Sequence, residues 1–223
     1  MGREAKGIMG MHLHEVHAAS VHAPLVTLPM AALVDAAASI SGDRQTAALG
    51  RKLWWLGVGA GALAGVAGLA ASQEIKAEDS RTEDMMWLHG AANFAVVLGA
   101  TGMALWRTFR RPSLGTAAVG LGACGIAVYT AYLGGEMVYA RGVGVRTMPW
   151  IAPTGVRESP ALTSARAPGA FVRDAAKGFA WLVRRTLGLL AGRAPLSRGA
   201  YGIEKIDRPD EIGAGAVGVE VNP

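Results

Sequence analysis

The stretch His22-Ala23-Pro24-Leu25-Val26-Thr27-Leu28-Pro29 opens an apolar run that continues through Asp35 to Ile40. A histidine, two prolines and a carboxylate are costly in a segment that is otherwise suited to lipid. Pro24 fits a first helical turn, where its missing N–H would be unpaired anyway, whereas Pro29 leaves a carbonyl free and predicts a kink. We therefore expect a membrane helix whose rigid entrance carries His22.

The composition supports this membrane interpretation. Of the 223 residues, 51% are hydrophobic and 31 are glycine, and the mean hydropathy is +0.28. Abundant glycine inside apolar runs is typical of closely packed membrane helices. A soluble helical protein is the less favoured alternative, because the apolar runs approach the ~20 residues that cross a bilayer.

Four apolar runs have the length of a membrane span, and they cover residues 23–40, 54–71, 85–106 and 114–133. A charged segment over 72–84 separates the second span from the third. Short connections make successive helices antiparallel. The sequence therefore predicts an all-α protein with a four-helix transmembrane bundle. We assign residues 21–145 to this membrane domain and residues 1–20 to a polar, histidine-containing N-terminal segment.

Three glycines, Gly57, Gly61 and Gly65, follow one another at four-residue steps in the second span. A helix face without side chains lets a neighbouring helix approach closely. We expect this face to be a packing surface. Trp54 and Trp55 at the start of the span fit the aromatic belt of a membrane interface.

The region 146–223 forms a tail rich in proline, glycine and arginine. Within it, residues from about 168 to 192 have apolar side chains on one broad side and basic side chains elsewhere. Such an amphipathic surface helix favours an anionic membrane surface, and packing on a partner subunit is the alternative. We expect the last twenty residues to form an irregular end of the chain.

Polar residues of three spans are expected to meet at one membrane face. Alternating helix directions place the start of span one, the start of span three and the end of span four on the same side. His22, His89 and Glu136 therefore converge, and Asn93 shares nearly the same helix face as His89. Asp35 lies about 20 Å deeper and does not join them.

The cysteine count, the N-terminus and the net charge argue against several classes of site and partner. The single cysteine, Cys124, excludes an internal disulfide and any four-cysteine metal site. No signal peptide is expected at the N-terminus, and the charge of +5 comes largely from the tail without a nucleic-acid-binding motif. His12, His14 and His17 could contribute to a metal site, but a solvated or interface-lying lead-in is the favoured interpretation.

The chain resembles a bacterial family of predicted membrane proteins, domain-of-unknown-function family 2231. The resemblance covers about residues 20–145 and rests on the stretch 22–29, on His89, and on the ending motif Leu133-Gly-Gly-Glu-Met-Val-Tyr-Ala-Arg-Gly-Val-Gly-Val145. Relatives usually have proline where Ala23 stands and a second histidine where Thr27 stands. They often have a further histidine where this chain has Ala140-Arg141.

The resemblance implies a multi-pass protein of the bacterial inner membrane. Some relatives are fused to a Rieske iron–sulfur domain, which implies a connection to electron transfer. A Rieske cluster needs two cysteines, so this chain does not itself carry one.

The leading functional hypothesis is a b-type haem held between helices one and three by His22 and His89, with Asn93 or Glu136 orienting a ligand or pairing with a propionate partner. The alternative is a structural or assembly subunit of a larger membrane complex, with no cofactor. A non-haem metal or quinone site is a third possibility. The expected partners are the lipid bilayer and other membrane or redox subunits, without nucleic acid. An electron carrier or accessory subunit is favoured over a stand-alone enzyme. The sequence shows no nucleophile and general base at a spacing typical of a catalytic site.

Overall fold

The computed structural model describes residues 13–75, 77, 79–144, 160 and 162–195. Expectations for His12, the first twelve residues and the last 28 lie outside this part of the chain. Within it the protein is all helical, as the sequence predicted. The helices are α1 (Leu13–Ser20), α2 (His22–Ser41), α3 (Arg44–Glu74), α4 (Ser80–Phe109), α5 (Leu114–Tyr139) and α6 (Ala167–Leu190).

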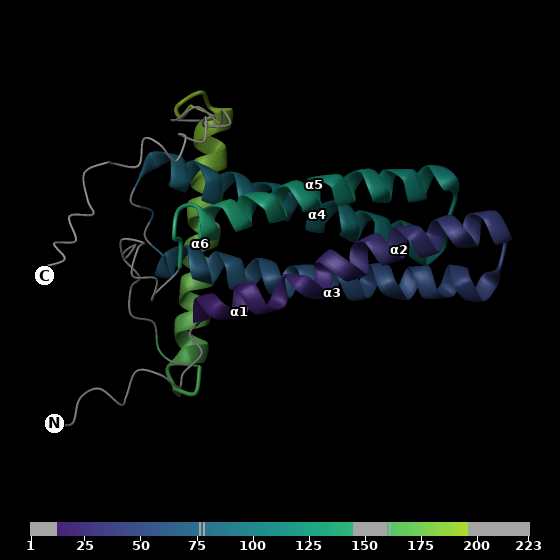
Figure 1. Cartoon of the computed structure of the whole chain (residues 1–223), viewed down its shortest axis with the longest axis horizontal. Helices are drawn as coiled ribbons and strands as arrows, with labels where there is room; N and C mark the ends of the chain where they lie inside the picture. The colour runs from purple at the N-terminus through teal and green to yellow at the C-terminus, as the bar shows by residue number, and fades with distance from the viewer. Residues whose placement is uncertain (1–12, 76, 78, 145–159, 161, 196–223) are drawn as a thin grey trace, which may run out of the picture.

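The helices α2, α3, α4 and α5 run lengthwise beside one another as an elongated bundle, and α6 crosses it near one end (Figure 1). Among the described residues, four helical segments are long and apolar enough to cross a membrane. They are Glu15–Ser41, Arg44–Glu74, Ser80–Phe109 and Leu114–Tyr139. The prediction of a four-span transmembrane bundle with a C-terminal helix is confirmed.

The connections are shorter than the sequence suggested, because capping residues start the helices early. Asp43 accepts a hydrogen bond from the backbone N–H of Thr46 and so begins α3 ten residues before the expected span. Asp79 does the same for α4 through Thr82. The expected charged loop over 72–84 is therefore wrong at both ends, since its outer residues belong to α3 and α4.

The first span also starts earlier than expected. Residues 13–20 form α1, and the chain continues into α2 with a single turn residue, Val21. The N–H of Val21 donates to the carbonyl of His17, which keeps the helical pattern across the junction. Pro24 has no N–H for the carbonyl of Ser20, which accounts for the break at this point. Pro29 lies inside α2 without ending it.

The glycines of α3 pack as predicted at two of the three positions. A Cβ at Gly57 would overlap the side chain of Leu28, and one at Gly61 would lie 3.0 Å from Val97. A Cβ at Gly65 would meet nothing within 4 Å, so this part of the prediction is wrong. Four-residue steps advance about 40° around a helix each time, so the third glycine has rotated away from its neighbours.

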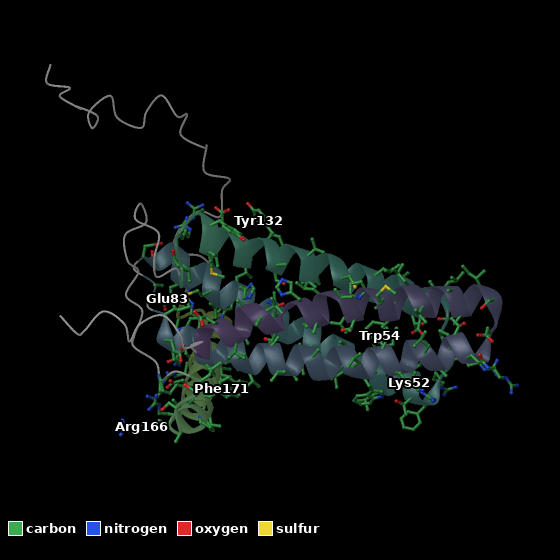
Figure 2. The ribbon with its side chains drawn as sticks, turned by 60° about the horizontal axis from the view of Figure 1, so that its bottom comes forward. Lys52, Trp54, Glu83, Tyr132, Arg166 and Phe171 are labelled. Carbon is green, nitrogen blue, oxygen red and sulfur yellow. The ribbon has the colours of Figure 1, made fainter. Side chains whose placement is uncertain are left out.

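The core near the far end of the bundle is built around Trp54, whose side chain lies among the helices in Figure 2. A Cβ at Gly120 of α5 would lie 3.0 Å from the Trp54 ring and 3.1 Å from Ala32 of α2. Small residues thus leave room for one large ring between three helices. The buried cluster comprises Leu28, Ala31, Ala32, Trp54, Ala100 and Ala104.

Candidate functional site

Two imidazole rings from different spans lie side by side near the end of the bundle that α6 crosses. His17 comes from α1 and His89 from α4, and their ring centres are 6.1 Å apart with the planes at 89°. Both side chains are partly buried. Histidine side chains inside a membrane protein are costly and usually mark a functional site.

Each ring is oriented by a hydrogen bond to a backbone carbonyl of a neighbouring helix. The Nδ1 of His17 lies 2.9 Å from the carbonyl oxygen of Ala64 in α3, and the Nδ1 of His89 lies 2.8 Å from that of Thr130 in α5. A carbonyl only accepts, so Nδ1 carries the proton in both rings. In the neutral imidazole, Nε2 is then the nitrogen with a free lone pair.

A glycine stands one turn beyond each accepting carbonyl and gives the ring its room. A Cβ at Gly68 would lie 3.0 Å from both Cε1 and Nδ1 of His17. A Cβ at Gly134 would lie 3.2 Å from Cε1 of His89. Both histidines are thus held by the same arrangement, a carbonyl and a glycine four residues later on the adjacent helix.

Asn93, predicted from the sequence to be a site residue, supports His89 through the backbone. Its Nδ2 donates to the carbonyl of His89 at 2.8 Å, and its Oδ1 accepts from the hydroxyl of Thr130 at 3.0 Å. Thr130 is buried and supplies the carbonyl that His89 uses. Asn93 therefore fixes the spacing of α4 and α5 at the histidine.

The structure places the other two predicted residues differently. His22 is exposed at the first position of α2, and the ring beside His89 is that of His17. Glu136 is half-buried in α5, two residues beyond Gly134. Sequence reasoning thus found His89 and Asn93 at the site, but it treated His17 as part of a solvated lead-in.

A second buried polar cluster lies deeper in the bundle. Asp35 of α2 and Arg107 of α4 form an ion pair with Nε 2.7 Å from Oδ2, and the Trp54 Nε1 donates to the same oxygen at 2.8 Å. Asp35 follows His17 by eighteen residues, and Arg107 follows His89 by the same number. Eighteen residues make five full helical turns, so each charged residue shares a helix face with a histidine. This repeated spacing distinguishes His17 from His22, but only once the pairing of Asp35 with Arg107 is known.

The helix α6 packs directly on the two helices next to the histidines. A Cβ at Gly178 would overlap the backbone carbonyl of Leu69, the residue after Gly68. A Cβ at Gly90, the residue after His89, would lie 3.5 Å from Leu182. The tail helix therefore closes one side of the region that holds the two rings.

The ring nitrogens of His17 and His89 are the candidate metal ligands of this site. Within the described ranges, no three His, Cys, Asp or Glu residues form a group that could hold a metal ion. The arrangement offers instead two histidines on separate helices, each with Nδ1 engaged. Such a pair can supply two ligands to one metal centre, or it can serve to hold the helices together.

Comparisons with known proteins agree with the membrane architecture. No curated protein and no solved structure matches the chain. One family model, described as "Predicted membrane protein (DUF2231)", matches residues 13–147, a range that begins with α1 and includes all four spans. The protein therefore belongs to the family of predicted membrane proteins known as DUF2231.

Proposed function

We propose that this multi-pass membrane protein is a b-type haem-binding electron-transfer subunit of the bacterial inner membrane. The residues that would hold the haem are His17 and His89, between the first and third spans. The observation that carries the proposal is the distance of 6.1 Å between the two imidazole centres.

This separation suits one metal atom bound by both rings. A metal–imidazole nitrogen bond is about 2 Å long, and a ring centre lies roughly 1 Å beyond its nitrogen, so ligands on opposite sides of a metal have centres roughly 6 Å apart. The rings can turn about their metal–nitrogen bonds, so perpendicular planes are compatible with such ligation. An ordinary edge-to-face contact between aromatic rings has the same separation and angle, so this geometry also suits a purely structural role.

The hydrogen bonds at Nδ1 fit the same role. A histidine that binds a metal almost always donates its other ring N–H to a carbonyl, a carboxylate or water. Ala64 and Thr130 supply these carbonyls and leave Nε2 of each ring for the metal. The proposal retains His89 as a ligand and replaces His22 with His17.

Asn93 is a positioning residue in this proposal, because it holds Thr130 and thereby the ring of His89. Glu136 lies six residues after Thr130 on α5 and is not assigned a contact with either ring. Haem supplies reversible one-electron chemistry when bound. The protein orients both imidazoles and surrounds them with apolar helices.

A structural or assembly subunit is the second candidate. One observation favours it: the two histidine hydrogen bonds already join α1 to α3 and α4 to α5. Each such bond satisfies a buried polar group that would otherwise destabilise the bundle. In this role the protein is colourless, and the histidines contribute only to stability.

The absorption spectrum of the purified protein distinguishes the two candidates. We expect the wild type, produced with ample haem supply, to show a low-spin spectrum in both oxidation states. His17→Ala and His89→Ala would each remove one of the proposed imidazole ligands and should give a high-spin spectrum or lose the haem. His22→Ala is the matched control, because His22 is exposed near His17 in sequence, and its spectrum should match the wild type.

A colourless wild-type protein that remains folded would refute the haem proposal and support the structural role. Equal spectra for His17→Ala and the wild type would exclude His17 as a ligand. If His22→Ala alone lost the low-spin spectrum, His22 would be the ligand from the first span, as the sequence predicted.

A further inference from the structure

We propose that α6 is an interfacial helix with three distinct faces. One face packs on the bundle, a second lies in the acyl-chain region of the bilayer, and a third binds the headgroups of anionic phospholipids. The binding partner is therefore the lipid surface itself. This inference is independent of whether haem is bound.

The position of α6 suits an interfacial helix. It lies across the bundle close to one end, whereas the spans run along the length of the bundle (Figure 1). If the spans cross the membrane, such a helix lies in the membrane plane. Its bundle face includes the buried residues Ala167, Ala170, Asp174, Gly178 and Leu182.

Contacts along α4 show which side of α6 points toward the centre of the bilayer. Near the start of α4, Asp84 forms an ion pair with Arg185. Further along α4, the ring of Phe94 lies 6.3 Å from that of Phe179. Phe94 is about 15 Å deeper along the span than Asp84. The Phe179 side of α6 therefore faces the membrane interior, and the Arg185 side faces the membrane surface.

The inward side of α6 is an exposed apolar surface. Val172, Phe179, Val183 and Leu190 lie within about 40° of one another around the helix, and Leu187 is about 80° from Phe179. Their relative exposures are 68, 45, 36, 77 and 58% in the order Val172, Phe179, Val183, Leu190 and Leu187. Large apolar side chains exposed along one arc of a helix mark an interaction surface.

The basic side chains lie on another arc. Arg173, Lys177 and Arg184 are all exposed and fall within about 40° of one another, roughly 120–160° from Phe179. This arc is on the side of α6 that faces out of the bundle end. Arg173 also pairs with Asp174 at 2.8 Å, while its own side chain stays 51% exposed.

Lipid accounts for both arcs at the depths at which they occur. Phe94 is 45% exposed on the surface of a membrane span, and Phe179 continues that apolar surface onto α6. A basic arc immediately above an apolar one matches the order of headgroups and acyl chains in an anionic leaflet. A protein partner would have to reproduce this same order of charge and apolar surface.

Adjacent residues on α6 allow a matched test in the full-length protein. After Cys124→Ala, a spin label is attached at Val183→Cys or at Arg184→Cys, and the protein is reconstituted into vesicles of phosphatidylcholine and phosphatidylglycerol. We expect the label at 183 to collide with oxygen and not with a water-soluble nickel chelate. The label at 184 should show the reverse preference. Equal, high accessibility to nickel at both positions would overturn the proposal, because it would place the apolar arc in water.

The headgroup contact is tested by lipid enrichment around the reconstituted protein. In mixed vesicles we expect phosphatidylglycerol to accumulate next to a label at position 183, relative to phosphatidylcholine. Each of Lys177→Gln and Arg184→Gln should reduce this preference about fivefold, because one basic residue near an anionic surface contributes about 1 kcal/mol. Lys52→Gln, an exposed cation at the opposite end of the bundle (Figure 2), is the control. No change in enrichment for the α6 variants would refute anionic headgroup binding.

Discussion

Asp35 and Arg107, 72 residues apart, form a two-pronged ion pair in the bundle interior. Nε of Arg107 lies 2.7 Å from Oδ2 and Nη2 lies 3.0 Å from Oδ1 of Asp35. The same guanidinium donates to the carbonyls of Ala47 and Arg110, and Trp54 donates to the carboxylate. One cluster thus ties α2, α3 and α4 together.

The first prediction concerns this ion pair. Asp35→Asn or Arg107→Gln alone should reduce the free energy of unfolding by about 3–5 kcal/mol, because each leaves a buried charge without its partner. The combined Asp35→Leu and Arg107→Met variant should recover much of this loss. Thermal unfolding in detergent measures the effect, and Arg110→Gln, an exposed neighbour, is the control. Losses that simply add in the double variant would show that the two residues do not act as a pair.

The second prediction concerns close helix contacts through glycine. Gly178→Ala should release α6 from α3, because the new Cβ would overlap the backbone carbonyl of Leu69. Backbone cannot rotate aside as a flexible side chain can, so we expect a loss of about 1–3 kcal/mol. Gly59→Ala and Gly65→Ala meet nothing within 4 Å and should be neutral or slightly stabilising. Limited proteolysis of α6 and thermal unfolding would together measure the difference, and similar behaviour of all three variants would contradict the close contact.

The third prediction concerns the room around the proposed haem ligand. Gly134→Ala would place a Cβ 3.2 Å from Cε1 of His89 and so shift the ring against its carbonyl partner. We expect less haem per protein and a shifted reduction potential in this variant, because imidazole orientation tunes the metal. Gly122→Ala on the same helix meets nothing within 4 Å and is the control. Unchanged haem content and potential in Gly134→Ala would show that this contact does not position His89.

The fourth prediction concerns the contribution of Asp79 to folding stability at acidic pH. Partial burial works to raise the pKa of Asp79, but hydrogen bonds from Thr82 and the charge of Arg141 outweigh it and lower the pKa below its usual value. A lowered pKa in the folded state means that the carboxylate stabilises the fold above the unfolded pKa, and that this contribution is lost as the pH falls through the folded pKa.

Asp79→Ala should therefore destabilise the start of α4 by about 1 kcal/mol at neutral pH, the usual cost of losing a helix cap. The difference from the wild type should shrink as the pH falls below about 4. Thermal unfolding between pH 7 and pH 3 measures it. A difference that stays constant across this range would mean that the ionised carboxylate is not responsible.

The sequence by itself determined the four spans, the tail helix and the membrane class. These features depend on local properties: the length of an apolar run, the charges that flank it and the spacing of apolar and basic residues around one helix. The close packing of other helices at Gly57 and Gly61 was predicted from the same kind of local spacing. The lengths of α3 and α4 did not, because capping by Asp43 and Asp79 extends them into charged sequence that hydropathy assigns to loops.

Only the tertiary structure decided which histidine meets His89. His17 and His22 lie near the start of one almost continuous helical span, so the length and hydropathy of that span cannot distinguish them. Five residues turn a helix by about 140°, so only one of the two rings can face both α3 and α4. The pairing of Asp35 with Arg107 was undetermined for the same reason. A sequence gives each residue its place around its own helix, but which faces of separate helices meet depends on how all four spans pack together.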